Sequence, residues 1–227
     1  MAIKYHHDII QGTQQWLEVR LGLLTASETC RIITPSTLKV AANDKMRAHV
    51  YEIAAQRITR YVEPAYQGDD IMRGHEDEVD ARDHYREHYG PVEECGFITN
   101  DEFGFTIGYS PDGLVNDDGQ IEIKSRRQHF QIQTIATGQV PTEHVIQVQT
   151  GLLVSKRPWC DFVSFSGGLP MDVLTTEPVA EFQEAIVAAA TTFESKVAEV
   201  IEAYHAAVQK RGLHPTERRL ERELIAI

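Results

Sequence analysis

Apolar residues recur along the chain at two different spacings, and each spacing predicts a different kind of element. In the longer segments they recur every three or four residues, as on one face of an α-helix. Asn43, which can cap a helix, precedes a segment in which Met46, Val50, Ile53 and Ala54 share such a face. The spacing predicts a helix over residues 16–21, a second that starts at a capping box at 25–28 and runs into Ile32 and Ile33, and a third that starts after Asn43. Further helices are predicted near 69–89 and over about 128–136, 143–154 and 178–209.

Shorter apolar runs, separated by Asn, Asp and Gly, predict β-strands. They cover residues 92–99, 105–109, 113–115, 120–125, 161–166 and 172–176. The order is helices, a β-meander, helices, strands and a long helix. This order favours an α/β fold of the mixed α+β kind, with a central mixed β-sheet flanked by helices. With 227 residues and 42% hydrophobic content, we expect a single domain spanning residues 1–227.

The composition bears on whether the protein lies in a membrane or is secreted. No apolar run approaches the roughly 18 residues that a membrane span requires. The N-terminal segment is polar, with His6, His7 and Asp8, and lacks the apolar core of a signal peptide. We therefore expect a cytoplasmic protein that is not bound to a membrane.

The cysteines do not form a metal-binding pattern. Cys30, Cys95 and Cys160 are isolated, and no C-x-x-C pair is present. We expect three reduced thiols in the core.

The formal net charge of −12 argues against a protein that coats DNA through a broad basic surface. It does not exclude an enclosed basic site, because a few Arg and Lys side chains can focus the field in a cleft. Carboxylates near such a site can in addition recruit divalent cations.

Candidate chemistry gathers around a predicted hairpin. If residues 117–119 form a three-residue loop with Gly119 in the left-handed conformation, Asp112 pairs with Lys124. Because side chains alternate along a strand, Asp112, Glu122 and Lys124 then project from one face. Two carboxylates can hold Mg²⁺ or Mn²⁺, and a neighbouring lysine can orient or deprotonate a metal-bound water.

The same residues also have an ordinary structural interpretation. Asp112 between Pro111 and Gly113 is typical of a turn, and Glu122 with Lys124 can be a solvated ion pair on an exposed strand. The spacing of the three charges leaves both interpretations open.

The full pattern resembles the signature of the PD-(D/E)xK nuclease superfamily. It consists of Pro111-Asp112, nine residues, and Glu122-Ile123-Lys124. The resemblance implies a restriction-endonuclease-like core.

Further segments resemble one branch, the lambda-type (YqaJ-like) phage recombination exonucleases. The segments are QGTQQWLEVRLG at 11–22 followed by LTASE at 24–28, residues 74–82 with EVDAR at 78–82, the pattern at 111–124, and QVQ at 147–149. They follow the order of the family's motifs over a similar chain length, whereas residues beyond about 155 carry no matching motif.

Membership of this family would imply a processive 5′-to-3′ exonuclease that acts on linear double-stranded DNA. It would release 5′-mononucleotides and leave 3′ overhangs for annealing-type homologous recombination. Two Mg²⁺ ions, which Mn²⁺ can replace, would bridge the scissile phosphate. The implied metal ligands are Asp112, Glu122, the carbonyl of Ile123, and Glu78; Lys124 would activate the attacking water, and either Gln147, which we favour, or Gln149 would reach the site.

The resemblance also assigns a pocket for the 5′-terminal phosphate to Arg20, Ser27 and Ser110. A guanidinium and two hydroxyls are suited to a dianionic end group. Without the resemblance, Arg20 would be interpreted as a solvated helix charge and Ser27 as a helix-start residue.

Other residues keep two interpretations. Trp16 is expected in the core rather than stacked on a base. Ile71 and Met72 could wedge apart the end of the duplex or could be buried.

The implied partners are linear double-stranded DNA, two further copies of the chain in a ring-shaped homotrimer, and a single-strand annealing protein. The setting would be the cytoplasm of a bacterial host that carries a phage or prophage. Two alternatives remain: a related nuclease with a different end preference, and a non-catalytic DNA-binding scaffold for the annealing protein.

Overall fold

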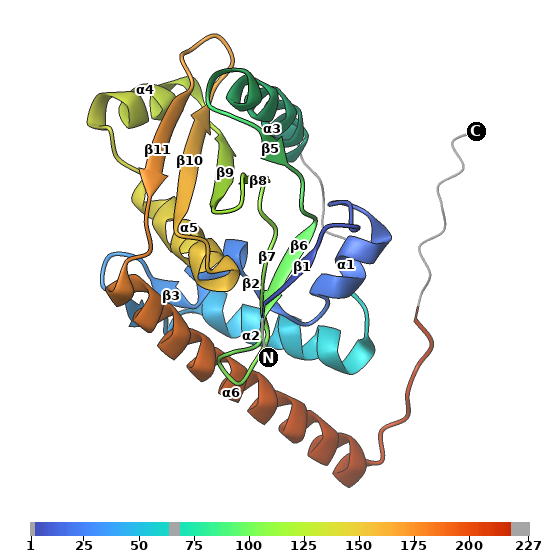
Figure 1. Ribbon diagram of the computed structural model, residues 1–227. Helices are drawn as coiled ribbons and strands as arrows, with labels where there is room; N and C mark the ends of the chain where they lie inside the picture. Colours follow the sequence, from blue (N-terminus) through green and yellow to red (C-terminus); the bar gives the residue numbers. More distant parts are fainter. Residues whose placement is uncertain (1–2, 64–68, 219–227) are drawn as a thin grey trace, which may run out of the picture.

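The computed structural model describes residues 3–63 and 69–218, without the side chains of residues 69–72 and 75. Helices and short strands alternate along the chain (Figure 1). In order they are β1 (Ile3–His6), α1 (Gln14–Arg20), β2 (Leu24–Thr25), the 3₁₀ helix η1 (Ala26–Arg31), β3 (Ile33–Thr34), β4 (Lys39–Val40), α2 (Asp44–Thr59), α3 (Asp69–His88), β5 (Val92–Glu93), β6 (Phe97–Asn100), β7 (Ile107–Tyr109), β8 (Gly113–Val115), β9 (Gly119–Ser125), α4 (Gln128–Thr137), α5 (Thr142–Ser155), β10 (Trp159–Phe165), β11 (Asp172–Thr176) and α6 (Ala180–Arg211).

The larger strands form two mixed sheets. One has the order β11-β10-β9-β8-β5, and the other has the order β1-β6-β7-β2. Strands β9 and β10 run parallel, whereas β9 pairs with β8 in an antiparallel hairpin. Mixed sheets flanked by helices confirm the predicted α/β fold class, although the strands form two larger mixed sheets and not one central sheet.

Helices cover both faces of the five-stranded sheet. On one face α3 packs on β9 and β10, and Tyr85 lies there in a cluster with Ile121, Ile123 and Val163. On the other face, side chains of α5 such as Val148 contact Phe162 of β10. Residues 121 and 123 of β9 therefore face α3, and the even-numbered residues between and beyond them face α5.

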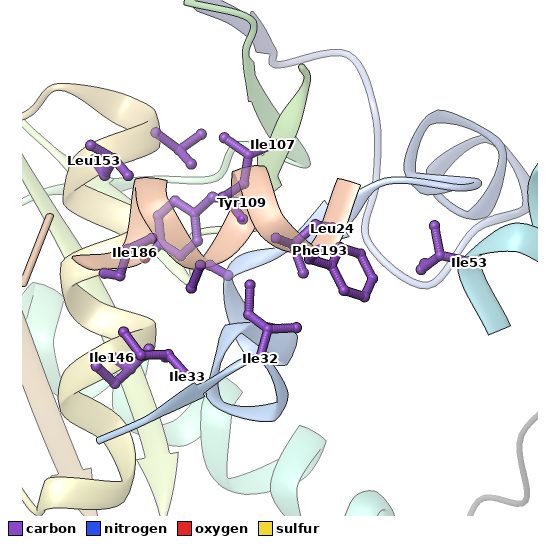
Figure 2. Close-up of a cluster of buried hydrophobic side chains, with 14 of the residues drawn as sticks. Leu24, Ile32, Ile33, Ile53, Ile107, Tyr109, Ile146, Leu153, Ile186 and Phe193 are labelled. Atoms are coloured by element: carbon purple, nitrogen blue, oxygen red, sulfur yellow. The ribbon is translucent and has the colours of Figure 1, made fainter. Parts of the chain in front are cut away.

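The largest core lies beside the four-stranded sheet. Figure 2 shows its side chains, including Leu24, Tyr109, Ile146 and Phe193, which come from β2, β7, α5 and α6. Burial of each such side chain stabilises the fold by about 1.5–3 kcal/mol. Through Tyr109 and Leu24, this core fixes the backbone next to the candidate site.

Two helix predictions have different outcomes. Asn43 caps α2, because its side chain accepts a hydrogen bond from the Met46 backbone N–H at 3.0 Å. The predicted capping box at 25–28 is wrong: Thr25 does not cap with its side chain, and the segment forms only the 3₁₀ helix η1. The Thr25 hydroxyl instead donates to Glu28 at 3.3 Å.

The spacing of apolar residues over 69–89 also predicts that Val79 is buried, and this prediction is wrong: Val79 of α3 is 53% exposed, and Ala81 occupies the buried position instead. Cys30 is exposed, whereas Cys95 and Cys160 are buried thiols as expected.

The predicted strand at 92–99 is in fact two strands in different sheets. β5 pairs with β8, and β6 pairs with β1 and β7. Gly96 lies between them, where a Cβ atom would collide with the carbonyl of Ile9. The chain thus crosses between sheets at a position that only glycine can occupy. The short strands β1, β2, β3 and β4 were not predicted; β2, β3 and β4 have only two residues each, too few to show an alternation.

Candidate active site

The hairpin that carries the predicted charges has a register different from the expected one. Leu114 pairs with Gln120, which places Asp112 opposite Glu122 rather than Lys124. Asn116, with a φ of 48°, takes the left-handed conformation predicted for Gly119, and asparagine tolerates that conformation well. Because the register differs by two residues, each side chain keeps its face.

Gly119 has another role. A Cβ atom at this position would collide with the ring of Trp159. The glycine therefore permits close packing of β9 against β10 rather than a turn.

Asp112 lies directly before β8 and is tied to β9. Its Oδ2 accepts a hydrogen bond of 2.6 Å from the Ile123 backbone N–H. The N–H and C=O groups of a strand residue point to the same side, so the Ile123 carbonyl also faces Asp112. Burial, together with the negative charges of Glu122 and Glu78, raises the pKa of Asp112 well above its ordinary value.

Glu122 is the most enclosed of the predicted ligands, with only 1% of its surface exposed. Its Oε2 accepts a hydrogen bond of 3.0 Å from the Tyr109 hydroxyl. Its Oε1 contacts the Lys124 ammonium at 2.6 Å and also accepts a hydrogen bond from Gln147. Both oxygens are therefore held in fixed positions.

The two glutamines of the QVQ segment point in different directions. Gln147 donates to Glu122. Gln149 is buried elsewhere, where it donates to the Glu177 carbonyl and accepts from the Val179 N–H, both at 2.9 Å. The structure thus brings Gln147, and not Gln149, to the carboxylates.

Lys124 has 24% of its side-chain surface exposed and is the basic group nearest to these carboxylates. Burial by itself would lower its pKa, but the charges of Glu122 and Asp112 outweigh burial and raise the pKa above the ordinary value. In the absence of a metal ion, Lys124 is therefore a stable ammonium.

Glu78 approaches from α3, where it forms an ion pair with Arg82 one turn later. Arg82 also donates from Nε to the Asp112 carbonyl at 2.8 Å. Glu78 and Asp112 line the same cavity of about 470 Å³. Arg82, which we did not single out from the sequence, thus connects α3 to the hairpin.

The oxygen donors at this place suit a hard divalent cation. Asp112, Glu122, the Ile123 carbonyl and Glu78 supply only oxygen atoms, the ligand type that Mg²⁺ and Mn²⁺ prefer. The buried Glu122, the half-buried Asp112 and one lysine leave an excess of negative charge that a cation would offset.

Arg20, Ser27 and Ser110 line a second cavity, next to the carboxylates. Arg20 donates to the Ser110 hydroxyl at 3.0 Å, and Trp16 donates to the same hydroxyl at 2.9 Å. The guanidinium lies 4.1 Å from the centre of the Trp16 ring. Ser27 joins through Thr25, whose hydroxyl lies 3.4 Å from that of Ser27 and 3.5 Å from the guanidinium.

Arg20 forms no ion pair with any carboxylate in the described part of the chain. Burial lowers its pKa, although the more distant charge of Glu28 partly opposes the effect. Its guanidinium is half-buried and contacts hydroxyls and the rings of Trp16 and Phe97, so among the described residues it lacks an anionic partner.

This second cavity, of about 170 Å³, joins the carboxylate group to the group around Arg20. Its lining includes Arg20, Ser27 and Ser110 as well as Asp112, Glu122, Lys124 and Gln147. Trp16, Thr25 and Tyr109 also line it. Trp16 is thus half-buried at the cavity rather than in the core, and it contacts Arg20 and Ser110.

Two predicted wedge residues cannot be placed. Ile71 and Met72 fall within α3, but their side chains lie outside the described part of the structure.

Comparison with known proteins gives the family. The family description "YqaJ-like viral recombinase domain" matches residues 15–158. A structure of an alkaline exonuclease (LHK-Exo) from Laribacter hongkongensis matches with a TM-score of 0.78 and 30% sequence identity, and it covers 88% of this chain and 100% of that chain. A second structure of LHK-Exo, in complex with dAMP, matches equally well.

A phage-related exonuclease from Haemophilus somnus 129PT shares the fold, with a TM-score of 0.57, 13% identity, and coverage of 80% of this chain and 96% of that chain. A search of the curated proteins gives no significant match. None of the described helices contains an apolar stretch long enough to cross a membrane. The family match covers most of the chain, so the chain belongs to the YqaJ-like viral recombinase domain family. Its similarity to the alkaline exonuclease identifies it as a recombination-type nuclease.

Proposed function

We propose that the protein is an Mg²⁺-dependent 5′-to-3′ exonuclease that acts on linear double-stranded DNA. It releases 5′-mononucleotides and leaves 3′ single-stranded overhangs for annealing-type recombination, with residues 1–227 acting as one nuclease domain. The observation that carries this proposal is the 170 Å³ cavity, which joins Arg20, a half-buried arginine with no ion pair among the described residues, to two carboxylates and a lysine.

Asp112, Glu122, the Ile123 carbonyl and Glu78 would hold two Mg²⁺ ions, which Mn²⁺ can replace. The ions would supply charge stabilisation for the attacking and leaving oxygens of phosphodiester hydrolysis. The protein's own part is positional. Tyr109 and Gln147 fix the Glu122 carboxylate, and the Ile123 N–H fixes Asp112.

Lys124 would orient the attacking water and take its proton. Its ammonium already bonds to Glu122 at 2.6 Å, so cation binding at that carboxylate would weaken the attraction that raises the lysine pKa. The lysine would then become a better base in the loaded site than in the metal-free one.

Arg20, Ser27 and Ser110 would bind the 5′-terminal phosphate. Such a contact would place the next phosphodiester over the carboxylates, because the two groups share one small cavity. The relative that binds dAMP supports a site for a nucleoside monophosphate, the class of product that this reaction releases.

The assembly is also a proposal. A homotrimeric ring and a single-strand annealing protein in the cytoplasm of a bacterial host would fit the family. A ring would reconcile the net charge of −12 with DNA binding, since basic groups would be needed only inside it.

The experiment follows both strands of a linear duplex in Mg²⁺, with one strand labelled at its 3′ end and the other labelled internally. We expect mononucleotides from the 5′ ends and intact 3′ termini. Asp112→Asn should abolish the products, whereas Asp118→Asn, in the exposed loop of the same hairpin, should retain them. Degradation from 3′ ends or internal nicks would indicate a related nuclease with another preference. DNA binding without any cleavage would indicate the scaffold.

A further inference from the structure

Helix α3 carries a second group of metal ligands on a face that the proposed nuclease site does not use. His84, Glu87 and His88 lie at helical positions i, i+3 and i+4, which are neighbours on the helix surface. One ligand atom from each of the three lies within 4.8 Å of the others. The two imidazole rings are in contact, with centroids 4.3 Å apart.

The group is separate from the catalytic carboxylates. Glu78 and Arg82 of α3 line the cavity that contains Asp112. His84 and Glu87 line a different groove of about 510 Å³, between α3 and residues 169–171. A ligand bound there would not reach the cavity of the nuclease.

The described residues contain one other group of three with comparable spacing, and it differs in an instructive way. In the group formed by Glu28, His49 and Glu52, Arg31 lies 3.6 Å from Glu28 and 3.1 Å from Glu52. A cation is thus already provided by the protein.

No arginine or lysine of the described residues pairs with Glu87, whose ion-pair contact is His88 at 3.9 Å. Arg86 turns away to Asp83, at 2.8 Å, and to Glu94. Asp80 on the same groove adds negative charge, whereas the charge of Asp83 is already compensated by Arg86. The potential at the imidazoles therefore favours an incoming cation.

The ligand types decide which cation. Imidazole nitrogen suits Zn²⁺, Ni²⁺ and Cu²⁺, whereas Mg²⁺ prefers oxygen ligands. The sequence HYREH at 84–88 also has the H-x-x-E-H spacing of the zinc-binding helix in one class of metallopeptidases. All three side chains are exposed here, so the spacing indicates binding without implying peptidase chemistry.

We propose that His84 and His88, with Glu87 as a third ligand, bind one transition-metal ion of the Zn²⁺ class on the surface of α3. The ion would link two successive turns near the end of the helix. Because α3 also positions Glu78 and Arg82, the site would stabilise the helix that borders the nuclease centre.

The test is calorimetric titration of the full-length protein with Zn²⁺ in a background of excess Mg²⁺, which competes for sites made of oxygen ligands. We expect one Zn²⁺ per chain. His84→Ala and His88→Ala should each weaken the affinity at least about tenfold, since each removes one of the two imidazole ligands. Glu87→Gln should weaken it less.

Two matched controls separate this site from other ligands. His214→Ala removes a different exposed histidine, and Cys30→Ser removes the exposed thiol; both should bind Zn²⁺ as the wild type does. Unchanged affinity in the His84 and His88 variants, or loss of binding in Cys30→Ser, would overturn the proposal. Nuclease activity in Mg²⁺ should be the same in all these variants, so the outcome does not depend on whether the proposed nuclease function is correct.

Discussion

The two ends of the 170 Å³ cavity carry opposite electrostatic imbalances. At one end Arg20 is half-buried with hydroxyls and a tryptophan ring, and no carboxylate of the described residues pairs with it. At the other end lie the buried Glu122 and the half-buried Asp112, with Lys124 bonded to Glu122. Uncompensated charges inside a protein are costly. Each end therefore lacks the partner that it would gain from a ligand: an anion for Arg20 and a cation for the carboxylates.

The largest expected effect comes from the end that carries the carboxylates. Asp112→Asn and Lys124→Ala should each reduce the rate of DNA hydrolysis by about a thousandfold or more, because one would remove a proposed cation ligand and the other the proposed proton acceptor. Single-turnover assays with the proposed linear duplex measure this. Asp118→Asn is the matched control, and activity near the wild-type level in Lys124→Ala would remove the lysine from the chemistry.

Cation binding should offset the excess negative charge of the carboxylates and thereby raise the stability of the folded protein. Mg²⁺ should raise the Tm of the wild type, by an amount equivalent to about 2.7 kcal/mol at a hundredfold excess over its Kd. Asp112→Asn should be insensitive to Mg²⁺. In chelator it should melt at or above the wild-type temperature, because it removes one of two crowded carboxylates but keeps an oxygen for the Ile123 N–H. Equal Mg²⁺ stabilisation of both proteins would contradict the ligand assignment.

The two glutamines of α5 sharpen the comparison, because only one of them contacts the carboxylates. Gln147→Ala should lower activity by roughly tenfold, since a bond to a charged group contributes about 1.5–3 kcal/mol, with little change in stability. Gln149→Ala should instead lower the free energy of unfolding by about 1–3 kcal/mol, through two lost buried hydrogen bonds, and retain the chemistry. Kinetics and urea unfolding of both variants distinguish these roles, and the reverse pattern would refute the assignment.

The smallest effect concerns His144, beside Lys124 and Arg126. Burial lowers the pKa of His144 to about 4, and the charges of Lys124 and Arg126 act in the same direction. In the unfolded chain the imidazole takes up a proton near pH 6.5. The unfolded state thus binds more protons between these values, and the free energy of unfolding falls as the pH drops from about 6.5 towards 4.

His144→Gln removes this titration and keeps an acceptor for Arg126, which bonds to His144 at 2.8 Å. Its unfolding free energy should decline less steeply in that window, by up to about 1.4 kcal/mol per pH unit. His129→Gln, at an exposed position, is the control. Parallel pH profiles of the unfolding free energy for wild type and His144→Gln would show that the protonation of His144 does not contribute to the pH dependence.

The sequence alone predicted the carboxylate end of the cavity better than the end with Arg20. Alternation along β9 correctly placed Glu122 and Lys124 on one face, and it survived a wrong register because the difference was two residues. Arg20 and Ser110 are 90 positions apart, so only the family resemblance could join them. Arg82 and Thr25 were missed as site residues, because their contacts depend on how α3 and β2 meet the hairpin.

The fold shows the same limit. Long helices such as α2 and α6 were recognisable from spacing, whereas the break at Gly96 depends on a distant segment, the Ile9 carbonyl. Periodicity reports which residues are buried within an element, and it does not report which sheet a two-residue strand joins.

The most direct test of the opposite imbalances is the ratio of initial rates on duplexes that differ only in a 5′-phosphate or a 5′-hydroxyl, measured for the wild type and Arg20→Met. We predict that the wild type prefers the phosphorylated end. Arg20→Met should lose roughly 10- to 100-fold in rate on that end, the equivalent of one charge-assisted contact, and little on the hydroxyl end. An unchanged ratio in Arg20→Met would contradict the account, because Arg20 would then not be the partner of the terminal phosphate.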